Sequence, residues 1–223
     1  MMPSRDWFSD DEVSALFAAV RTPWWKAFLS LGVDVGLRPV ESLNTLWEDI
    51  DPTTLSVRVQ PRQAEELRLG DGAVVPVLAF FPSANCDRTV PAPPYTINAL
   101  RRLRRSCEQG SPYVFVPAER LCRLFPLLDS GRSATTADLA PGLGRVFVSV
   151  QRGARVELSK RLRQPLAETP WRQRTLAALR NTFAQRAAEA MRPADLAAHL
   201  GFARSTAVLA HYDRNFRDRG GEA

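Results

Sequence analysis

Hydrophobic residues recur every three to four positions through the first 50 residues, and this spacing predicts helices. The pair Ser9 and Glu12 has the spacing of a capping box, which marks the start of the first helix. Gly36 suits the end of a second helix, and Pro39 suits the first turn of a third. The predicted helices cover residues 9–20, 22–36 and 39–46.

The pattern changes between residues 51 and 93, where apolar and polar residues alternate over short runs. Alternation with period two is typical of half-buried strands. Pro76 favours an edge strand or a bulge for the middle run, because proline cannot donate to a strand ladder. We predict a small three-stranded antiparallel sheet from residues 55–59, 73–81 and 88–90.

Helical spacing returns after Pro94. In the first of these helices Leu100, Leu103 and Cys107 share one face and a run of arginines occupies the other. Residues 113–116 are expected to be a buried extended segment, and the tail 213–223 is expected to be flexible. Further helices are predicted at residues 139–154, 171–191, 193–200 and 205–212. The predicted fold class is therefore α+β and mostly helical.

Composition excludes several protein classes. The 223 residues are 45% hydrophobic and 24% charged, as in a packed water-soluble domain, and no apolar run reaches the ~18 residues of a membrane span. The three cysteines follow no metal-ligand spacing and the first residues do not look like a secretory signal, so we expect no metal site and a reducing, cytoplasmic location.

The charge distribution is asymmetric although the net charge is only +6. Residues 1–93 hold 8 basic and 13 acidic residues, and residues 94–223 hold 22 basic and 11 acidic ones. A basic half of this kind is a candidate for binding a polyanion such as nucleic acid. The alternative is a solvated basic face without a partner.

Three short motifs carry candidate chemistry. They are Gly36-Leu37-Arg38, followed by Glu41; Leu179-Arg180-Asn181-Thr182-Phe183; and Leu200-Gly201-Phe202, followed ten residues later by Tyr212. Each has an ordinary structural explanation when taken alone, such as a helix cap, a surface arginine or a packing tyrosine.

In this order the motifs resemble the catalytic domain of the tyrosine recombinases, the phage-integrase family. The resemblance runs from about residue 9 to residue 214 and includes the predicted sheet. It implies site-specific DNA cleavage and rejoining through a 3′-phosphotyrosyl link, with no metal or other cofactor. The expected partner is double-stranded DNA, on which the chain would form a homo-oligomer or join a complementing recombinase.

The resemblance assigns roles to individual residues. Arg38 and Arg180 would clamp the nonbridging phosphate oxygens, and Tyr212 would be the nucleophile. All three are expected to converge on one basic concave face. Glu41 is expected to orient Arg38. Asp49 is expected to help orient it from the next layer of residues, without contacting the phosphate. DNA contacts are expected from the basic residues Arg101, Arg104, Arg105, Arg174 and Arg204.

The sequence departs from the family where protons are transferred. Ala177 stands where the family has histidine. Phe202 stands where the family has histidine or tryptophan. The family lysine of the sheet turn is missing, with Ser83 near its place, and no lysine lies between Lys26 and Lys160. Since a general acid or base contributes about 10²- to 10⁴-fold, we expect strand exchange to be strongly weakened or absent.

The domain organisation also differs from the family pattern. We predict a single catalytic-type domain over residues 1–223, without the N-terminal DNA-clamping domain, and hence weaker, more salt-sensitive DNA binding. Two alternatives remain. One is a non-enzymatic DNA-binding or regulatory module, since residues 193–206 also read as a helix-turn-helix. The other is a helical protein with no nucleic-acid role.

Overall fold

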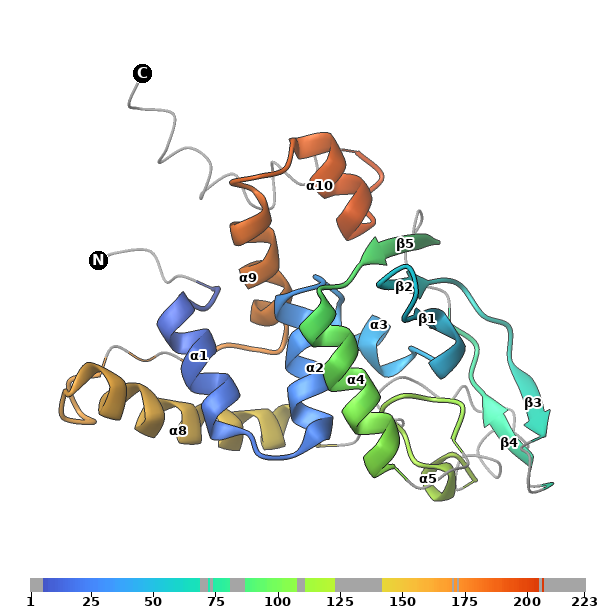
Figure 1. Ribbon diagram of the computed structural model, residues 1–223, viewed down its shortest axis with the longest axis horizontal. Coiled ribbons are helices and arrows are strands. Elements are labelled where there is room, and N and C mark those ends of the chain that lie inside the picture. Colours follow the sequence, from blue (N-terminus) through green and yellow to red (C-terminus); the bar gives the residue numbers. More distant parts are fainter. Residues whose placement is uncertain are drawn as a thin grey trace.

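The computed structural model describes residues 6–68, 72, 74–80, 87–107, 111–122, 142–169, 171, 173–204 and 206. The fold is mixed α+β and mostly helical, as predicted, with the sheets at one side of a helical body (Figure 1). No helix in the described part of the chain is long and apolar enough to cross a membrane. The helices are α1 (Asp10–Ala19), α2 (Pro23–Val33), α3 (Pro39–Leu43), the 3₁₀ helix η1 (Trp47–Asp49), α4 (Pro94–Ser106), α5 (Ala118–Cys122), α8 (Leu143–Leu162), α9 (Ala177–Ala187) and α10 (Pro193–Leu200).

Helix α1 begins with the predicted capping box. The Ser9 amide donates to Glu12 Oε2 at 2.8 Å, and the Glu12 amide donates to Ser9 Oγ at 3.4 Å. Glu12 is also buried and pairs with Arg174, with 3.2 Å between Oε1 and the guanidinium. One carboxylate thus caps α1 and ties it to the segment before α9, while the body of α1 packs along α8.

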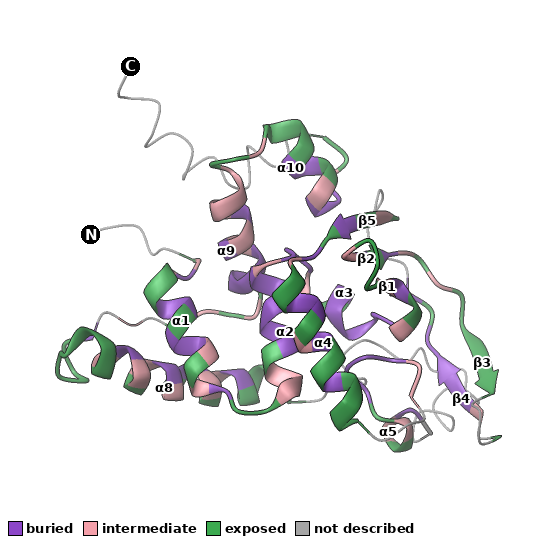
Figure 2. Cartoon of the chain, in the orientation of Figure 1, coloured by how far each residue is buried: buried purple, intermediate pink, exposed green. Residues whose placement is uncertain are grey.

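Helix α2 forms the centre of the core. All its residues from Ala27 to Val33 are buried, and the buried positions of the molecule gather around it and α9 (Figure 2). Gly32 allows α9 to approach closely, since a Cβ there would lie 2.6 Å from Leu179 Cβ. This close crossing fixes α9, and therefore Arg180, against the end of α2.

The three-stranded antiparallel sheet is present, and two of its strands are those expected, but the third is not. It consists of β1 (Ile50–Asp51), β2 (Ser56–Val59) and β5 (Arg88–Pro91), in the order β1-β2-β5. The expected strand at 73–81 appears as β4 (Val74–Val77), which pairs with β3 (Glu65–Arg68) in a separate two-stranded sheet. All four β3 residues are exposed, so no alternation marks this strand in the sequence.

Other boundaries also differ from the prediction. Helix α9 starts at Ala177 rather than near residue 171. The segment before it is bound by side chains from other elements, including Gln151, whose Nε2 donates to the Arg174 carbonyl at 2.8 Å. Helix α8 continues to Leu162, and Cys107 is exposed at the end of α4 instead of joining the face of Leu100 and Leu103. Residues 113–116 are buried as predicted, but they are not extended throughout: Tyr113 forms a single bridge with Leu46, and residues 114–116 are bends. The predicted helix at 205–212 and the tail 213–223 lie almost wholly outside the described residues.

Candidate functional site

A single buried carboxylate, that of Glu41, lies at the centre of three arginines. Its side chain is fully buried on α3. Arg38 Nη1 lies 3.3 Å from Oε1, and Arg88 donates to both oxygens, at 3.1 and 2.9 Å. Arg180 Nη1 lies 3.6 Å from Oε2. Three guanidinium groups around one carboxylate leave a net charge of +2 within this group, which we call the arginine cluster (Arg38, Arg88, Arg180 and Glu41).

The sequence places Glu41 there through the start of α3. Arg38 occupies the N-cap, and its amide donates to Glu41 Oε2 at 2.8 Å. The turn that precedes Arg38 depends on Gly36, whose φ of +76° favours glycine. A Cβ at Gly36 would also lie 2.5 Å from Phe183 Cδ1, so α9 packs directly on this turn.

Backbone carbonyls hold the two buried arginines. Arg180 donates to the carbonyls of Gly36, at 2.9 Å, and Leu200. Arg88 Nε donates to the His199 carbonyl at 2.7 Å. Two of these acceptors are carbonyls in the last turn of α10, where helix carbonyls lack intrahelical partners and the dipole favours cations.

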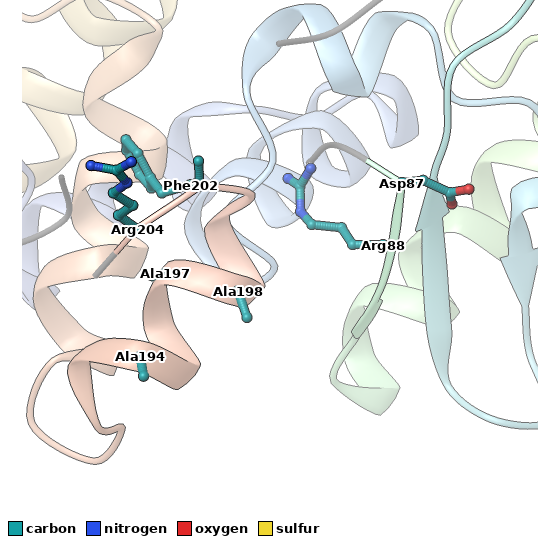
Figure 3. Close-up of a pocket in the computed structure, with 8 residues that line it drawn as sticks. Asp87, Arg88, Ala194, Ala197, Ala198, Phe202 and Arg204 are labelled. Atoms are coloured by element: carbon teal, nitrogen blue, oxygen red, sulfur yellow. The ribbon is translucent and has the colours of Figure 1, made fainter. Parts of the chain in front are cut away.

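Phe202 completes the cluster. Its ring centroid lies 5.8 Å from Arg38 Cζ and 5.5 Å from Arg180 Cζ. A pocket of about 480 Å³ opens beside it, between α10 and the start of β5. Figure 3 shows Arg88 reaching from β5 toward Phe202, while the Asp87 side chain points away. The pocket is lined by Asp87, Arg88, Ala194, Ala197, Ala198, Phe202, Ala203 and Arg204.

No protein-family model matches the sequence, and no curated protein sequence matches it. Solved structures do match. The XerA recombinase aligns at 19% identity with a TM-score of 0.61, covering 98% of this chain and 64% of that one. The Tn1549 transposon integrase in complex with a circular intermediate DNA aligns at 19% identity and a TM-score of 0.59, covering 99% of this chain and 67% of that one. A lambda integrase dimer bound to a core site aligns at 14% identity and a TM-score of 0.52, covering 100% and 51%.

The chain has the fold of the tyrosine-recombinase catalytic domain. The predicted resemblance is confirmed at the level of the fold, and the chain spans about two thirds of the length of the XerA recombinase.

Within this tyrosine-recombinase fold, the two residues predicted to stand at the family's proton-transfer positions can be located. Ala177 is exposed at the first residue of α9, three residues before Arg180. Phe202 presents an apolar ring to two arginines. Ser83 and Tyr212 lie outside the described residues.

His199 has a structural position in this fold. Its ring stacks on Phe183, with centroids 4.6 Å apart, and Nε2 lies 2.8 Å from the Val35 carbonyl. Burial lowers the pKa of His199, and the nearby charges of Arg88 and Arg180 lower it further. The imidazole is therefore neutral at pH 7 and bonds α10 to the turn after α2.

The expected support of Arg38 by Asp49 stays a prediction, and the structure shows other partners of the Asp49 carboxylate. This carboxylate, buried at the last residue of η1, forms an ion pair with Arg62 and accepts hydrogen bonds from Gln60 Nε2, at 3.0 Å, and the Leu46 amide, at 2.8 Å. Asp49 therefore anchors the segment that follows β2. Arg62 lies in this segment, only 13 residues after Asp49 in the sequence, and this short separation favours the pairing.

The five basic residues expected to contact DNA fall into two groups. Arg101, Arg104 and Arg105 are exposed on α4, and Arg204 is exposed at the pocket. Arg174 is internal: its side chain is 6% exposed, pairs with Glu12 and lies 4.8 Å from the Phe8 ring centroid. It links α1 to the core rather than presenting charge to solvent.

Arg88 is the residue of the cluster that sequence reasoning did not assign to the site. It faces Val59 in the sheet, and its side chain is 8% exposed. No local pattern connects Arg88 with Glu41, 47 residues earlier. Among the described residues, no group of three His, Cys, Asp or Glu side chains is placed to hold a metal ion.

Proposed function

We propose that this chain binds double-stranded DNA at the arginine cluster and that its strand-cleavage chemistry, through Tyr212, is strongly slowed or lost. The fold supports the first part, since proteins of this fold have been solved on DNA, among them the Tn1549 integrase and lambda integrase. We propose the same single domain as the sequence indicated, with its recombinase-like part over residues 9–214.

The observation that carries the proposal is the charge of the arginine cluster. Within the cluster itself three guanidinium groups face one carboxylate, so the formal charge of these four side chains is +2, which favours a bound phosphodiester. Arg38 is the most exposed of the three, at 29% against 8% and 6% for Arg88 and Arg180. In the proposal, Arg38 contacts a nonbridging oxygen first, and the rigidly held Arg180 contacts a second.

The cleavage step requires proton transfer as well as charge. The Tyr212 hydroxyl would give up its proton and attack phosphorus, forming the 3′-phosphotyrosyl bond and breaking the bond to the 5′ oxygen, which must take up a proton as it leaves. Ala177 and Phe202 carry no transferable proton. Arg88 lies close by, but a guanidinium stays protonated in proteins and is a poor acid.

A second candidate function also follows from Ala177 and Phe202, which carry no transferable proton. With Ala177 and Phe202 in place, a module that binds DNA without cutting it needs only the arginine cluster. On this alternative Tyr212 is dispensable, and a partner recombinase on the same DNA supplies cleavage. Both candidate functions are compatible with a homo-oligomer of this chain on DNA.

Covalent trapping tests whether any cleavage remains, which is what separates a slowed recombinase from a module that only binds DNA. The purified chain would be incubated with nicked suicide duplexes and with supercoiled plasmid, beside Tyr212→Phe and Arg38→Gln controls. A slow adduct that disappears in Tyr212→Phe supports residual cleavage. Salt-sensitive binding without adduct supports the DNA-binding module. Rapid turnover would contradict the proposal of weakened chemistry, and no binding at micromolar protein in low salt would contradict both candidates.

A further inference from the structure

The position of Phe202 is set by the end of α10. Gly201 adopts φ of +68°, the Gly201 amide donates to the Ala198 carbonyl at 3.1 Å, and the Phe202 amide donates to the Ala197 carbonyl at 2.9 Å. This pair of bonds is the Schellman motif, which places an apolar residue just after the glycine. The backbone of Phe202 is thereby fixed, and its ring lies against Arg38 and Arg180.

The two arginines differ in how far their side chains are buried. Arg180 is bound by two carbonyls and is 6% exposed. Arg38 is 29% exposed and lies 3.3 Å from Glu41 through one guanidinium nitrogen. A long side chain at a half-open site has several rotamers, and ordering it on binding costs free energy. An aromatic face within about 6 Å of each guanidinium attracts both cations without occupying the N–H groups that would bind an anion.

We propose that Phe202 is a positioning residue that holds Arg38 beside Arg180, so that the pair is preorganised for one phosphate group. The Phe202 side chain cannot donate a hydrogen bond to a phosphate. In this proposal it maintains phosphate affinity by keeping the two arginines in place. This inference rests on the proposed DNA-binding function, and it concerns how the site is ordered rather than whether it cleaves.

Phe202 also has a purely structural explanation. It packs with Leu196, Leu200 and their neighbours in the small apolar cluster between α9 and α10. Any apolar residue would satisfy that cluster and the Schellman motif. The two explanations therefore separate by substitution: Phe202→Leu keeps an apolar side chain but removes the aromatic face, whereas Phe202→Trp keeps the face.

The first test compares DNA affinity with folding. Affinity for a 30-base-pair duplex would be measured by fluorescence anisotropy at fixed low salt, and thermal unfolding would be followed on the same samples. We expect Phe202→Leu to bind about tenfold more weakly, with an unfolding midpoint lowered by less than about 4 °C, and Phe202→Trp to bind within about twofold of the parent. In an Arg38→Gln background the Phe202→Leu effect should shrink, since one of the two cations is already absent. Equal affinity of Phe202→Leu and the parent, or equal losses for Leu and Trp, would overturn the proposal.

The second test does not depend on DNA. Protons that lie over an aromatic ring are shielded, so the Nε–H signals of Arg38 and Arg180, assigned by Arg→Lys variants, should move downfield in Phe202→Leu and remain shielded in Phe202→Trp. Unchanged signals in Phe202→Leu would overturn the positioning role. If the parent chain binds no DNA, the proposed function fails, and this spectrum still decides whether Phe202 orders the arginines.

Discussion

Glu41 stabilises the fold and the site through the same contacts. A buried carboxylate is tolerated only when its partners compensate the lost hydration, and here three arginines and the Arg38 amide do so. The carboxylate limits the repulsion of three positive groups, and these groups in turn fix α3, β5 and α9 around it.

Replacing Glu41 with glutamine should therefore be costly. Glu41→Gln leaves three guanidinium groups without a buried counter-charge, and we expect the free energy of unfolding to fall by about 3–5 kcal/mol, measured by urea denaturation. Glu48→Gln is the control, because Glu48 also pairs with an arginine, at 3.1 Å, but is 69% exposed. That change should cost less than about 1 kcal/mol. Similar losses for both variants would contradict the central role of Glu41.

Gly36 offers a second prediction for a single residue. Gly36→Ala combines a φ of +76° with a Cβ placed 2.5 Å from the Phe183 ring. Gly142→Ala is a matched control, since its φ is +80° but a Cβ there meets no atom within 4 Å. The control should lose about 1–2 kcal/mol for the backbone conformation alone, and Gly36→Ala about 1–3 kcal/mol more. If urea denaturation gave equal losses of unfolding free energy for the two variants, the Phe183 ring would be able to move aside without destabilising the fold.

Among the elements, α10 is anchored by groups whose protonation matters. His199 bonds to the Val35 carbonyl, while its own carbonyl accepts from Arg88. Burial lowers the pKa of His199, so the unfolded chain binds a proton more readily than the folded one as the pH falls. The stability contributed by the neutral ring is therefore present above about pH 6.5, the unfolded value, and is lost as pH falls through the lower folded pKa.

Unfolding free energies at several pH values check this assignment. The parent chain should lose stability between pH 7.5 and 5.5, and His199→Gln should lose less over the same interval, because glutamine can donate to Val35 but does not titrate there. At pH 7.5 the variant should be the less stable of the two, since it lacks the stacking on Phe183. Parallel pH curves for the two proteins would contradict the assignment.

The elements also show what a sequence reveals and what it hides. The cap of α1 was predictable because both of its partners are local, at positions 9 and 12. Strand β3 was not, because all its side chains are exposed and its partner β4 could equally have joined the larger sheet. The late start of α9 escaped prediction because Gln151 and Glu12, which hold the preceding segment, come from distant elements.

At the scale of the whole molecule, the arginine cluster brings together residues from three regions of the chain, namely the start of α3, β5 and α9. Arg38 and Arg180 were indicated by motif order, and both contact Glu41 and Phe202, while their catalytic roles stay predictions. Arg88 and the pairing of Asp49 with Arg62 could not be inferred, because an arginine in the sequence carries no sign of which carboxylate it will meet.

The distribution of positive charge over the molecule leads to a prediction about DNA binding. Four exposed arginines lie on α4, which follows directly after the strand that carries Arg88. Helix α8, which packs against α1, also carries exposed basic residues. If the surface beside the arginine cluster faces DNA, replacing Arg101, Arg104 and Arg105 together with glutamine should weaken binding and reduce the salt dependence, by about 0.9 in slope for each phosphate that is no longer neutralised. Replacing Arg145, Arg152 and Lys160 on α8 removes the same charge and should leave the slope nearly unchanged. Affinities measured from about 50 to 200 mM salt give both slopes. Equal effects of the two triple variants would mean that DNA responds to the net charge of the chain and not to a surface organised around the arginine cluster.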